Sequence, residues 1–180
     1  MKLIILDRDG VINYDSADYI RNASEWRALP GSLEAIAQLT QNGYTVVVCT
    51  NQSGIGRHLF TLEDLEQIHN KMQQQVEECG GSIAAIFFCP HVPSDNCACR
   101  KPRPQMIFDI CRQFKIDNIA DVMMVGDSQR DLVAIDTAGG IPILVKTGSG
   151  EKTLSAGNAP EGTLVFDDLL AVCNYLLKIK

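Results

Sequence analysis

The chain alternates short runs of consecutive apolar residues with longer stretches in which apolar residues recur at helical spacing. The short runs are rich in Val, Ile, Leu, Met and Phe, without an alternation of apolar and polar positions. Such runs are typical of parallel strands that are covered on both faces. They predict six strands, at residues 3–6, 44–49, 83–88, 122–125, 142–145 and 163–166. The amphipathic stretches predict helices at residues 32–42, 62–79, 104–114, 129–138 and 168–178.

Residues at the ends of the predicted helices support these bounds. Thr61 and Ser128 are each followed three residues later by an Asp, which is the spacing of a capping box with Asp in place of Glu or Gln. Gly43, Gly80 and Gly139 follow the predicted carboxyl ends, where glycine is favoured. The stretch 147–162, rich in Gly and Ser, predicts a surface loop.

Regular alternation of strands and helices predicts an α/β fold, namely a three-layer, doubly wound parallel sheet of the Rossmann-like type. We expect residues 1–180 to form one domain, because a domain has roughly 100–200 residues. In such folds the ligand binds at the carboxyl ends of the strands. Four of the predicted strands are followed there by Asp7, Thr50, Cys89 and Asp127.

Composition narrows the class of protein. Hydrophobic residues make up 46% of the 180 residues, which excludes a disordered chain. No apolar run approaches the ~20 residues of a membrane span. With 16 basic and 22 acidic residues the net charge is −6, which disfavours nucleic-acid and anionic-membrane partners. Seven cysteines, an odd number, and an amino-terminal apolar run too short for a signal peptide predict reduced thiols in the cytoplasm.

Carboxylates at the predicted strand ends suggest a metal site. Asp7 and Asp9 are two residues apart, so that both side chains can face one site in extended chain. Asp127 brings a third carboxylate to the same edge of the sheet. Two close carboxylates coexist with a cation or a shared proton, and oxygen ligands of this kind suit Mg²⁺. The alternative is that each Asp only caps a turn.

The turn from Thr50 to Gly54 offers a hydroxyl and free backbone N–H groups, which bind phosphate oxygens. Taken alone this signal is weak, because Ser and Thr are common in turns. Arg100 and Lys101 add positive charge before a predicted helix, which a net-acidic protein needs to bind an anion. A solvated basic pair is the alternative for Arg100 and Arg103.

Taken together, four segments resemble the haloacid dehalogenase-like phosphohydrolases. They are Asp7-Arg8-Asp9-Gly10, Thr50-Asn51, Lys101-Pro102 and Gly126-Asp127-Ser128 followed by Asp131, in the order of the family's motifs. The resemblance covers residues 2 to about 148. It implies that Asp7 attacks phosphorus and forms an aspartyl-phosphate, and that Asp9 is the general acid and then the base. It also implies that Thr50 and Lys101 hold the phosphoryl group.

The resemblance further implies that Mg²⁺ is bound by Asp7, the backbone carbonyl of Asp9, and Asp127. Phosphoryl transfer depends on positioning and charge neutralisation, which agrees with these roles. Asp7 then has to be ionised, whereas Asp9 has to carry a proton for the first step. Asp131 is explained by its capping position, and a supporting role beside the metal is compatible with that position.

The cysteines divide into two groups. Cys89, His91, Cys97 and Cys99 occupy one predicted loop, and three Cys with one His form a common structural zinc set. Chance clustering is the alternative, whereas strain and the compartment disfavour a disulfide between Cys97 and Cys99. The remaining residues, which lie alone in predicted strands or helices, are expected to be small buried hydrophobes: Cys49, Cys79, Cys111 and Cys173.

The Cys/His loop resembles the zinc loop of two subfamilies, the D-glycero-D-manno-heptose 1,7-bisphosphate 7-phosphatases and the histidinol-phosphate phosphatases. The run Asn51-Gln52-Ser53-Gly54 favours the heptose subfamily, which implies hydrolysis of the C7 phosphate. No stretch is long enough for a separate cap domain, so loops have to select the substrate. The resemblance implies contacts to the sugar and its second phosphate from Asp15, Ser16, Ala17, Asp18, Thr50, Asn51, Gln52, Ser53, Arg100 and Lys101.

One position departs from the pattern, because these enzymes often carry a basic residue where this chain has Ser128. Arg57 or Arg130 could replace it, although both can be read as exposed charges. We expect a monomer that acts on a small phosphorylated sugar. A phosphoreceiver domain, which is a signalling domain and not an enzyme of this kind, is one alternative. Phosphoreceiver domains lack an acid/base residue two positions after the phosphorylated Asp, whereas this chain has Asp9 there. A 3′-phosphatase that acts on nucleic acid is a further alternative. Such an enzyme would need a basic groove, which the net charge of −6 disfavours.

Overall fold

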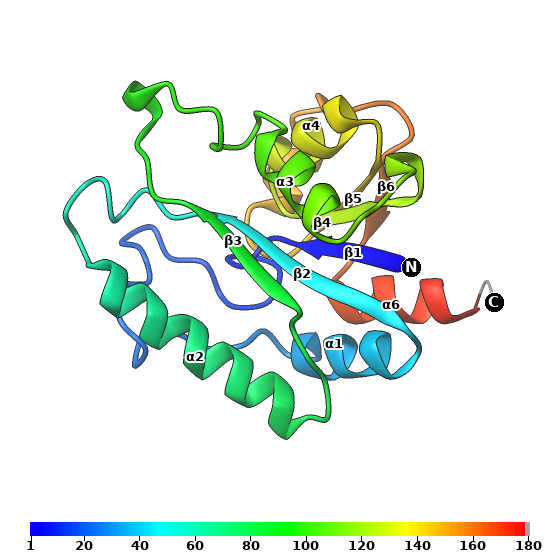
Figure 1. Ribbon diagram of the computed structural model, residues 1–180, viewed down its shortest axis with the longest axis horizontal. Coiled ribbons are helices and arrows are strands. Elements are labelled where there is room, and N and C mark those ends of the chain that lie inside the picture. Colours follow the sequence, from blue (N-terminus) through cyan, green and yellow to red (C-terminus); the bar gives the residue numbers. More distant parts are fainter. Residues whose placement is uncertain (179–180) are drawn as a thin grey trace.

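The computed structural model describes residues 1–178. Six strands form one parallel sheet in the order β3-β2-β1-β4-β5-β6 (Figure 1). This is the doubly wound arrangement that the sequence predicts, because the chain starts in the middle of the sheet and adds strands on both sides. The strands are β1 (Lys2–Leu6), β2 (Tyr44–Asn51), β3 (Ala85–Cys89), β4 (Met123–Gly126), β5 (Ile141–Val145) and β6 (Leu164–Phe166).

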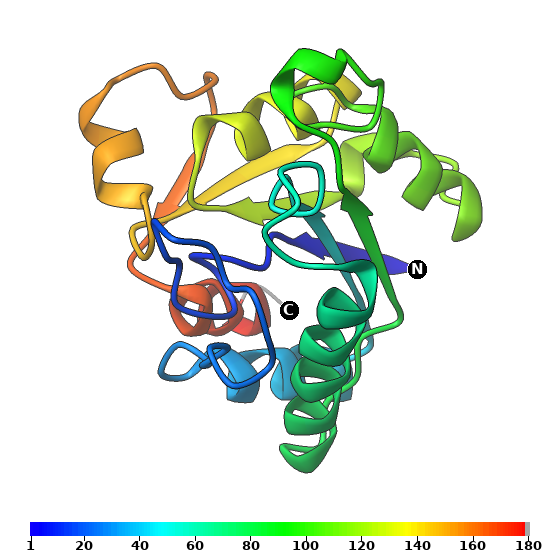
Figure 2. The same cartoon turned by 90° about the vertical axis from the view of Figure 1, so that its left-hand side faces the viewer.

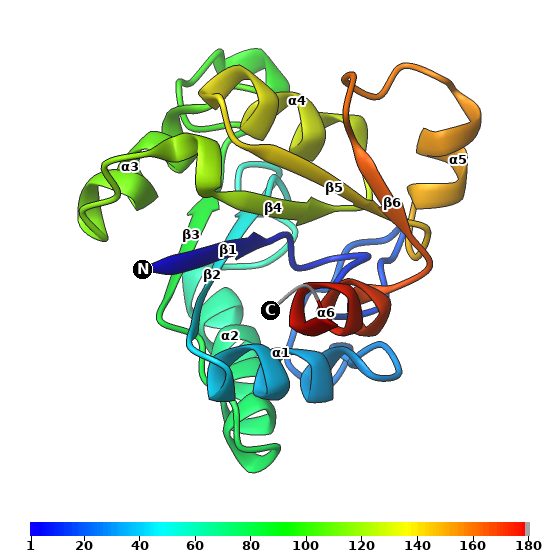
Figure 3. The ribbon, with the colours of Figure 1, turned by 90° about the vertical axis from the view of Figure 1, so that its right-hand side faces the viewer.

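Helices cover both faces of the sheet and complete the three layers. One face carries α1, α2 and α6, of which α1 packs against both of the others, and the opposite face carries α3 and α4 (Figures 1 and 3). The helices are α1 (Ser32–Gln41), α2 (Leu62–Glu78), α3 (Gln105–Gln113), α4 (Gln129–Ala138), α5 (Gly150–Ser155) and α6 (Leu169–Lys178). None of these helices, which all lie within residues 1–178, has the length and hydropathy needed to cross a bilayer.

Each face of the sheet has its own apolar core. Along β1, Ile4 and Leu6 belong to the cluster beneath α1, α2 and α6, whereas Leu3 and Ile5 belong to the cluster beneath α3 and α4. All four side chains are at most 1% exposed. Successive strand residues point to opposite faces, so a strand buried on both faces has to be apolar throughout. The uninterrupted apolar runs in the sequence are a consequence of these two cores.

The predicted elements agree with the structure to within about two residues, and both capping interactions are present. Thr61 Oγ1 accepts from the backbone N of Asp64 at 3.1 Å, and Ser128 Oγ donates to Asp131 Oδ2 at 2.6 Å. Strands β2 and β3 extend further than predicted, so that Thr50 and Cys89 are strand residues. The reason is that parallel pairing continues to the last register position, Asn51 opposite Cys89.

Two predictions are wrong. The stretch 147–162 is not entirely a loop, because it contains α5, whose Thr153 hydroxyl donates to Asp127 O at 2.9 Å. This tertiary contact stabilises a helix that the Gly- and Ser-rich composition does not predict. Cys79 is exposed at the carboxyl end of α2, whereas Cys49, Cys111 and Cys173 are buried as predicted.

The carboxyl ends of β1, β2 and β4 meet at one edge of the sheet, which Figure 2 shows from the front. The loops after β1, β2 and β3 surround this edge. Residues 7–31 contain no helix or regular strand, only two isolated bridges that Asn13 makes with Asp9 and with Ala28. No inserted domain covers the edge within the described residues, as the absence of a stretch long enough for a cap predicts.

Candidate active site and metal centres

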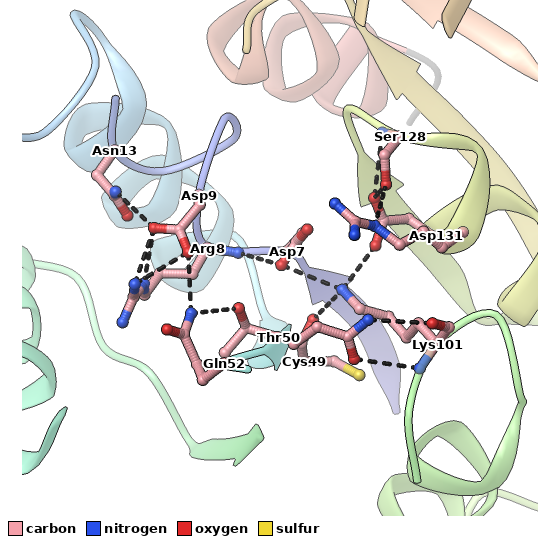
Figure 4. A network of polar contacts seen from close by, with 12 residues as sticks. Asp7, Arg8, Asp9, Asn13, Cys49, Thr50, Gln52, Lys101, Ser128 and Asp131 are labelled. Atoms are coloured by element: carbon pink, nitrogen blue, oxygen red, sulfur yellow. Dashed lines mark hydrogen bonds and ion pairs between the residues drawn. The ribbon is translucent and has the colours of Figure 1, made fainter. Parts of the chain in front are cut away.

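Lys101 is the centre of a buried ionic cluster at the carboxyl edge of the sheet. Its Nζ lies 2.6 Å from Asp131 Oδ1 and 3.1 Å from Asp7 Oδ1, and it donates to Cys49 O at 2.6 Å. Lys101 is 2% exposed and Asp131 is fully buried. Figure 4 shows the ammonium group between the two carboxylates. Lys101 therefore places one positive charge directly against the predicted nucleophile.

Lys101 and Asp131 each stabilise the charged form of the other. Burial alone lowers the pKa of Lys101, but the Asp131 and Asp7 carboxylates outweigh it and raise that pKa above its usual value. Burial likewise raises the pKa of Asp131, but the Lys101 charge and hydrogen bonds from Lys101 and Ser128 hold it below its usual value. Lys101 and Asp131 are therefore an ionised pair, and the capping residue Asp131 also neutralises and positions the active-site lysine.

The surroundings of Asp7 and Asp127 disfavour the charged carboxylate, in contrast to those of Asp131. Burial and the charge of Asp131 raise the pKa of Asp7 to about 8 and the pKa of Asp127 to about 7. Carboxylate oxygens of Asp7, Asp127 and Asp131 lie within 4.8 Å of one another. Negative charge that is buried and repelled in this way is stabilised by a cation. The donor set therefore fits a divalent ion that prefers oxygen ligands.

The loop after β5 holds Asp127 in place. Ser149 N donates to Asp127 Oδ2 at 2.7 Å, and Thr147 Oγ1 donates to Gly10 O at 2.6 Å. Gly148, between them, has a φ of +57°, and a methyl group there would lie 2.2 Å from Asp127 Oδ2 and 2.5 Å from the Cα of Gly10. Only glycine fits at this position, because two segments and a carboxylate meet there.

The Asp9 carboxylate receives hydrogen bonds from three side chains. The fully buried Arg8 pairs with both carboxylate oxygens, at 2.9 Å each from Nη2, Asn13 Nδ2 donates at 2.9 Å and Gln52 Nε2 at 2.9 Å (Figure 4). Burial raises the pKa of Asp9, but the Arg8 charge and these hydrogen bonds outweigh it and lower the pKa. The surroundings therefore favour the carboxylate, whereas the predicted first step needs the acid.

A polar cavity of about 330 Å³ opens above Asp7 and Asp9. The predicted residues Asp15, Ser16 and Ala17 line it, and so do Thr50 through Ser53, Arg100, Lys101 and Asp127. Asp18 instead lines a neighbouring depression that also includes Asp15 and Ser16. The cavity has four further lining residues: Tyr19, Ile20, Arg57 and Arg130.

Cys89, His91, Cys97 and Cys99 come together at one point of the loop after β3. Their ligand atoms all lie within 4.8 Å of one another. The Sγ atoms of the cysteines are 3.2 to 3.6 Å apart, and Nδ1 of His91 is 3.3 Å from the Cys99 Sγ. These separations exclude disulfides between the three cysteines. They are close to the edges of a tetrahedron around one ion with metal–sulfur distances of about 2.3 Å.

The chain matches a known family over most of its length. Residues 5–139 match the model of the haloacid dehalogenase-like hydrolases. The chain belongs to this family. The resemblance that the four sequence motifs indicate is therefore confirmed.

Relatives within the family are similar over the whole chain. D-glycero-beta-D-manno-heptose-1,7-bisphosphate 7-phosphatase of Bordetella bronchiseptica is 56% identical over 178 residues, which cover 99% of each chain. The enzyme of the same name from Pseudomonas putida is 51% identical, over 98% of this chain and 100% of that one.

Solved structures of similar proteins have the same fold. A crystal structure of D,D-heptose 1,7-bisphosphate phosphatase from B. bronchiseptica, complexed with magnesium and phosphate, is 55% identical and superposes with a TM-score of 0.98 over 100% of both chains. The corresponding phosphatase from Burkholderia thailandensis is 48% identical, with a TM-score of 0.79 over 98% of this chain and 99% of that one.

The sequence did not predict the contacts that Arg8 and Asn13 of this hydrolase make with Asp9. Neighbouring residues of an extended strand point to opposite sides, which argues against a contact between Arg8 and Asp9. However, β1 ends at Leu6, and Gly10 turns the chain with a φ of +81°. The sequence Arg8-Asp9 directly before a glycine was the only signal of this pairing.

Proposed function

We propose that this hydrolase removes the 7-phosphate of D-glycero-D-manno-heptose 1,7-bisphosphate, through an aspartyl-phosphate and with Mg²⁺. The observation that carries the proposal is the Asp7–Lys101 pair on the floor of a polar cavity. Enzymes named for this reaction are 50–56% identical to the chain over nearly its full length, which supports the same substrate. Their names specify the beta anomer, which we adopt for this protein.

In the first step Asp7 attacks phosphorus, and the bond between phosphorus and the sugar oxygen breaks. Asp7 Oδ1 is occupied by Lys101 and by the backbone N of Arg8, at 2.7 Å, so the other carboxylate oxygen is the one available for attack. Lys101 offsets the charge of the phosphoryl group. Thr50 Oγ1 accepts from Gln52 Nε2 at 3.0 Å, which leaves its proton free for a phosphoryl oxygen.

Asp9 gives a proton to the leaving sugar oxygen and accepts one from the water that hydrolyses the aspartyl-phosphate. Phosphate and the regenerated Asp7 carboxylate are the products of the second step. The hydrogen bonds from Arg8, Asn13 and Gln52 favour the ionised Asp9, which is the form that accepts the proton from water. The first step requires that Asp9 is protonated when the substrate is bound.

Mg²⁺ would be held by Asp7, Asp127 and the backbone carbonyl of Asp9, and it would neutralise negative charge on the carboxylates and the phosphoryl group. Support comes from the raised pKa values of Asp7 and Asp127 and from the similar B. bronchiseptica enzyme, which was solved with magnesium and phosphate.

We infer that Cys89, His91, Cys97 and Cys99 bind a structural zinc ion. Four protein ligands leave no open position, so this ion would not activate water. The loop reaches the substrate cavity through Arg100, and hydrogen bonds from two arginines hold the loop together. Arg100 Nη1 donates to His91 O at 3.1 Å, and Arg103 Nη1 donates to the carbonyls of Asn96 and Cys97. The zinc loop would therefore fix Arg100 and Lys101 relative to the substrate.

Contacts to the heptose are assigned to the loops that surround the cavity. Asp15, Ser16 and Ala17 line it on one side, and Thr50, Asn51, Gln52 and Ser53 on another. Gln52 already donates to Asp9 and Thr50, so we expect its carbonyl oxygen to be available to a sugar hydroxyl. Asp18 would reach only a part of the substrate that extends beyond the cavity.

A substrate panel tests this function. Phosphate release with Mg²⁺ is measured from heptose 1,7-bisphosphate, histidinol phosphate and a 3′-phosphorylated oligonucleotide. We expect a clear preference for the heptose bisphosphate, with loss of turnover in Asp7→Asn and not in Asp117→Asn, a control outside the cavity. A preference for histidinol phosphate would contradict the assignment of heptose 1,7-bisphosphate as the substrate. Stable phosphorylation without turnover would instead indicate a phosphoreceiver.

The compartment and the assembly state are also proposals. All seven cysteines are free of disulfides, which suits the reducing cytoplasm. A monomer is proposed because one chain supplies every residue of the cavity assigned above. Size-exclusion chromatography with light scattering tests the assembly state, and a dimer at micromolar concentration would contradict it.

A further inference from the structure

His69 is a polar residue on the buried side of α2. Its side chain is 7% exposed, and the other buried residues of this helix are apolar: Leu65, Ile68, Met72 and Val76. Burial and the charge of Arg8 lower the pKa of His69 to about 3, so the imidazole is neutral. A buried neutral imidazole has one donor and one acceptor nitrogen, and it needs a polar partner.

The polar partner of His69 is Arg8, whose Nη1 lies 3.4 Å from His69 Nε2. A guanidinium group only donates, so Nε2 is the acceptor and the proton of the imidazole is on Nδ1. Arg8 is fully buried, and within residues 1–178 His69 is the only hydrogen-bond partner of its Nη1. Without an acceptor at residue 69, a buried N–H group would therefore lose its hydrogen bond.

The other side of the Arg8 guanidinium group holds Asp9. Arg8 Nε and Nη2 donate to Asp9 Oδ1 at 3.0 and 2.9 Å, and Nη2 also donates to Oδ2 at 2.9 Å (Figure 4). Asp9 lies beyond β1, which ends at Leu6, and its side chain is 21% exposed and lines the cavity. Arg8 thus contacts His69 and Asp9 at once, so that α2 influences the direction of a carboxylate in the active site.

A second residue of α2 fixes the segment that follows β1. Lys71 Nζ donates to Ala23 O at 2.7 Å and to Trp26 O at 2.9 Å. Trp26 is fully buried in the core beneath α1, α2 and α6. These contacts hold residues 7–31 against α2, so that His69 supports them from a fixed place.

We propose that His69 is a positioning residue for the proton transfers: it holds the Arg8 guanidinium group, which in turn points the Asp9 carboxylate at the leaving oxygen. This inference rests on the proposed function, in which Asp9 transfers the protons. His69 affects the position of the carboxylate and not the charge beside it, because Arg8 is charged with or without this contact. Misplacement by about 1 Å can lower a rate about 100-fold.

The test compares substrates that differ in their need for a general acid. A sugar oxygen needs a proton from Asp9 to leave, whereas p-nitrophenolate leaves as a stable anion. Values of kcat/KM are measured for heptose 1,7-bisphosphate and p-nitrophenyl phosphate, because kcat/KM reports the steps up to formation of the aspartyl-phosphate. In His69→Leu, which has no acceptor, we expect kcat/KM to fall by about 10- to 100-fold for the heptose and to stay unchanged for p-nitrophenyl phosphate.

Further variants separate the hydrogen bond from packing. His69→Gln keeps an acceptor near the place of Nε2 and should recover most of the kcat/KM for the heptose. Val76→Ala removes buried apolar atoms of the same helix, so it should lower the Tm without changing the ratio of the two kcat/KM values. His69→Met also lacks a nitrogen or oxygen acceptor, and it takes the place of His69→Leu if that variant does not fold.

Three results would overturn the proposal. In His69→Leu or His69→Met, they are equal losses of kcat/KM for both substrates, which would indicate a general effect on the site, and wild-type values for both. The third is a loss for the heptose in His69→Gln as large as in His69→Leu, because the acceptor would then be irrelevant.

A third substrate separates this proposal from the proposed function. If the wild type releases no phosphate from heptose 1,7-bisphosphate, the proposed function is wrong, and phenyl phosphate takes the place of the heptose in the comparison. Phenolate is a stronger base than p-nitrophenolate, so its departure depends more on a general acid. A loss in His69→Leu with phenyl phosphate alone would support the role of His69, whereas equal losses with both aryl phosphates would overturn it.

Discussion

The side chain of Asn51 forms two hydrogen bonds with the backbone of Lys101, a residue fifty positions away in the chain. Asn51 Nδ2 donates to Lys101 O at 3.0 Å, and Asn51 Oδ1 accepts from Lys101 N at 3.1 Å. The last residue of β2 thereby fixes the backbone that carries the active-site lysine. The contact joins the predicted phosphate-binding turn to the end of the zinc loop.

Asn51→Ala should lower kcat/KM by about 10-fold or more, because two backbone groups of Lys101 lose their partner and the ammonium group is less well positioned against Asp7. Steady-state kinetics with Mg²⁺ measure this effect. Asn70→Ala, on the exposed surface of α2, is the matched control and should have wild-type kinetics. Wild-type kcat/KM in Asn51→Ala would show that the position of Lys101 does not depend on this contact.

Removal of zinc should weaken substrate binding and leave the Mg²⁺ requirement unchanged. Cys97→Ser deletes one ligand, and we expect loss of bound zinc together with a higher KM or a lower kcat, because Arg100 and Lys101 follow directly after Cys99. Zinc content is measured by atomic emission beside the kinetics. Cys79→Ser, at an exposed cysteine outside the cluster, should retain both zinc and activity. Full activity of a zinc-free protein supplied with Mg²⁺ would contradict this prediction.

The sheet and the main motifs could be predicted because their signals are local. A strand that is buried on both faces needs a run of apolar residues. The carboxyl ends of parallel strands all lie at the same edge of the sheet, where ligands bind. Asp7, Thr50 and Asp127 could therefore be assigned to one site before any geometry was known. The cluster of three cysteines and one histidine could also be predicted, because all four residues lie within eleven positions.

Three contacts at this edge of the sheet could not be predicted, because each depends on how the chain is folded. Arg8 reaches Asp9 only because the chain turns after β1, and Asp131 pairs with Lys101 across the active site. Helix α5 forms where its Thr153 meets the carbonyl of Asp127. The sequence assigned no contact to Arg8 and predicted a loop at residues 147–162, whereas Asp131 keeps its predicted capping role and adds the ion pair with Lys101.

Without Mg²⁺, the protein should become less stable as the pH rises from about 6.5 to about 8.5. The pKa values of Asp7 and Asp127 are raised to about 8 and about 7, so in this range the folded state binds protons that the unfolded state has already lost. Stability then falls with pH. His69 does not contribute there, because burial and Arg8 lower its pKa to about 3.

Thermal unfolding in EDTA measures this dependence, and the Tm should fall across that pH range. Mg²⁺ should raise the Tm more at pH 8.5 than at pH 6.5, because the ion binds the deprotonated carboxylates. Asp127→Asn removes one of the two groups and should flatten the profile in EDTA. A Tm in EDTA that is constant or rises with pH would show that the carboxylates are not destabilised in the folded state.

Gly148→Ala should impair Mg²⁺ binding through the contact between Gly148 and Asp127. The new methyl group would lie 2.2 Å from Asp127 Oδ2, so the carboxylate or the loop has to move. Gly157→Ala is the matched control, because its φ of +67° is close to the +57° of Gly148, while no atom lies within 4 Å of the added methyl group. Both variants should lose about 1–2 kcal/mol of stability from the left-handed backbone. Only Gly148→Ala should need a higher Mg²⁺ concentration for half-maximal activity, by about 10-fold for a loss of ~1.4 kcal/mol in binding. If both variants have the same Mg²⁺ dependence, the position of Asp127 is set by other contacts, and the close approach of Gly10 and Gly148 has no role in metal binding.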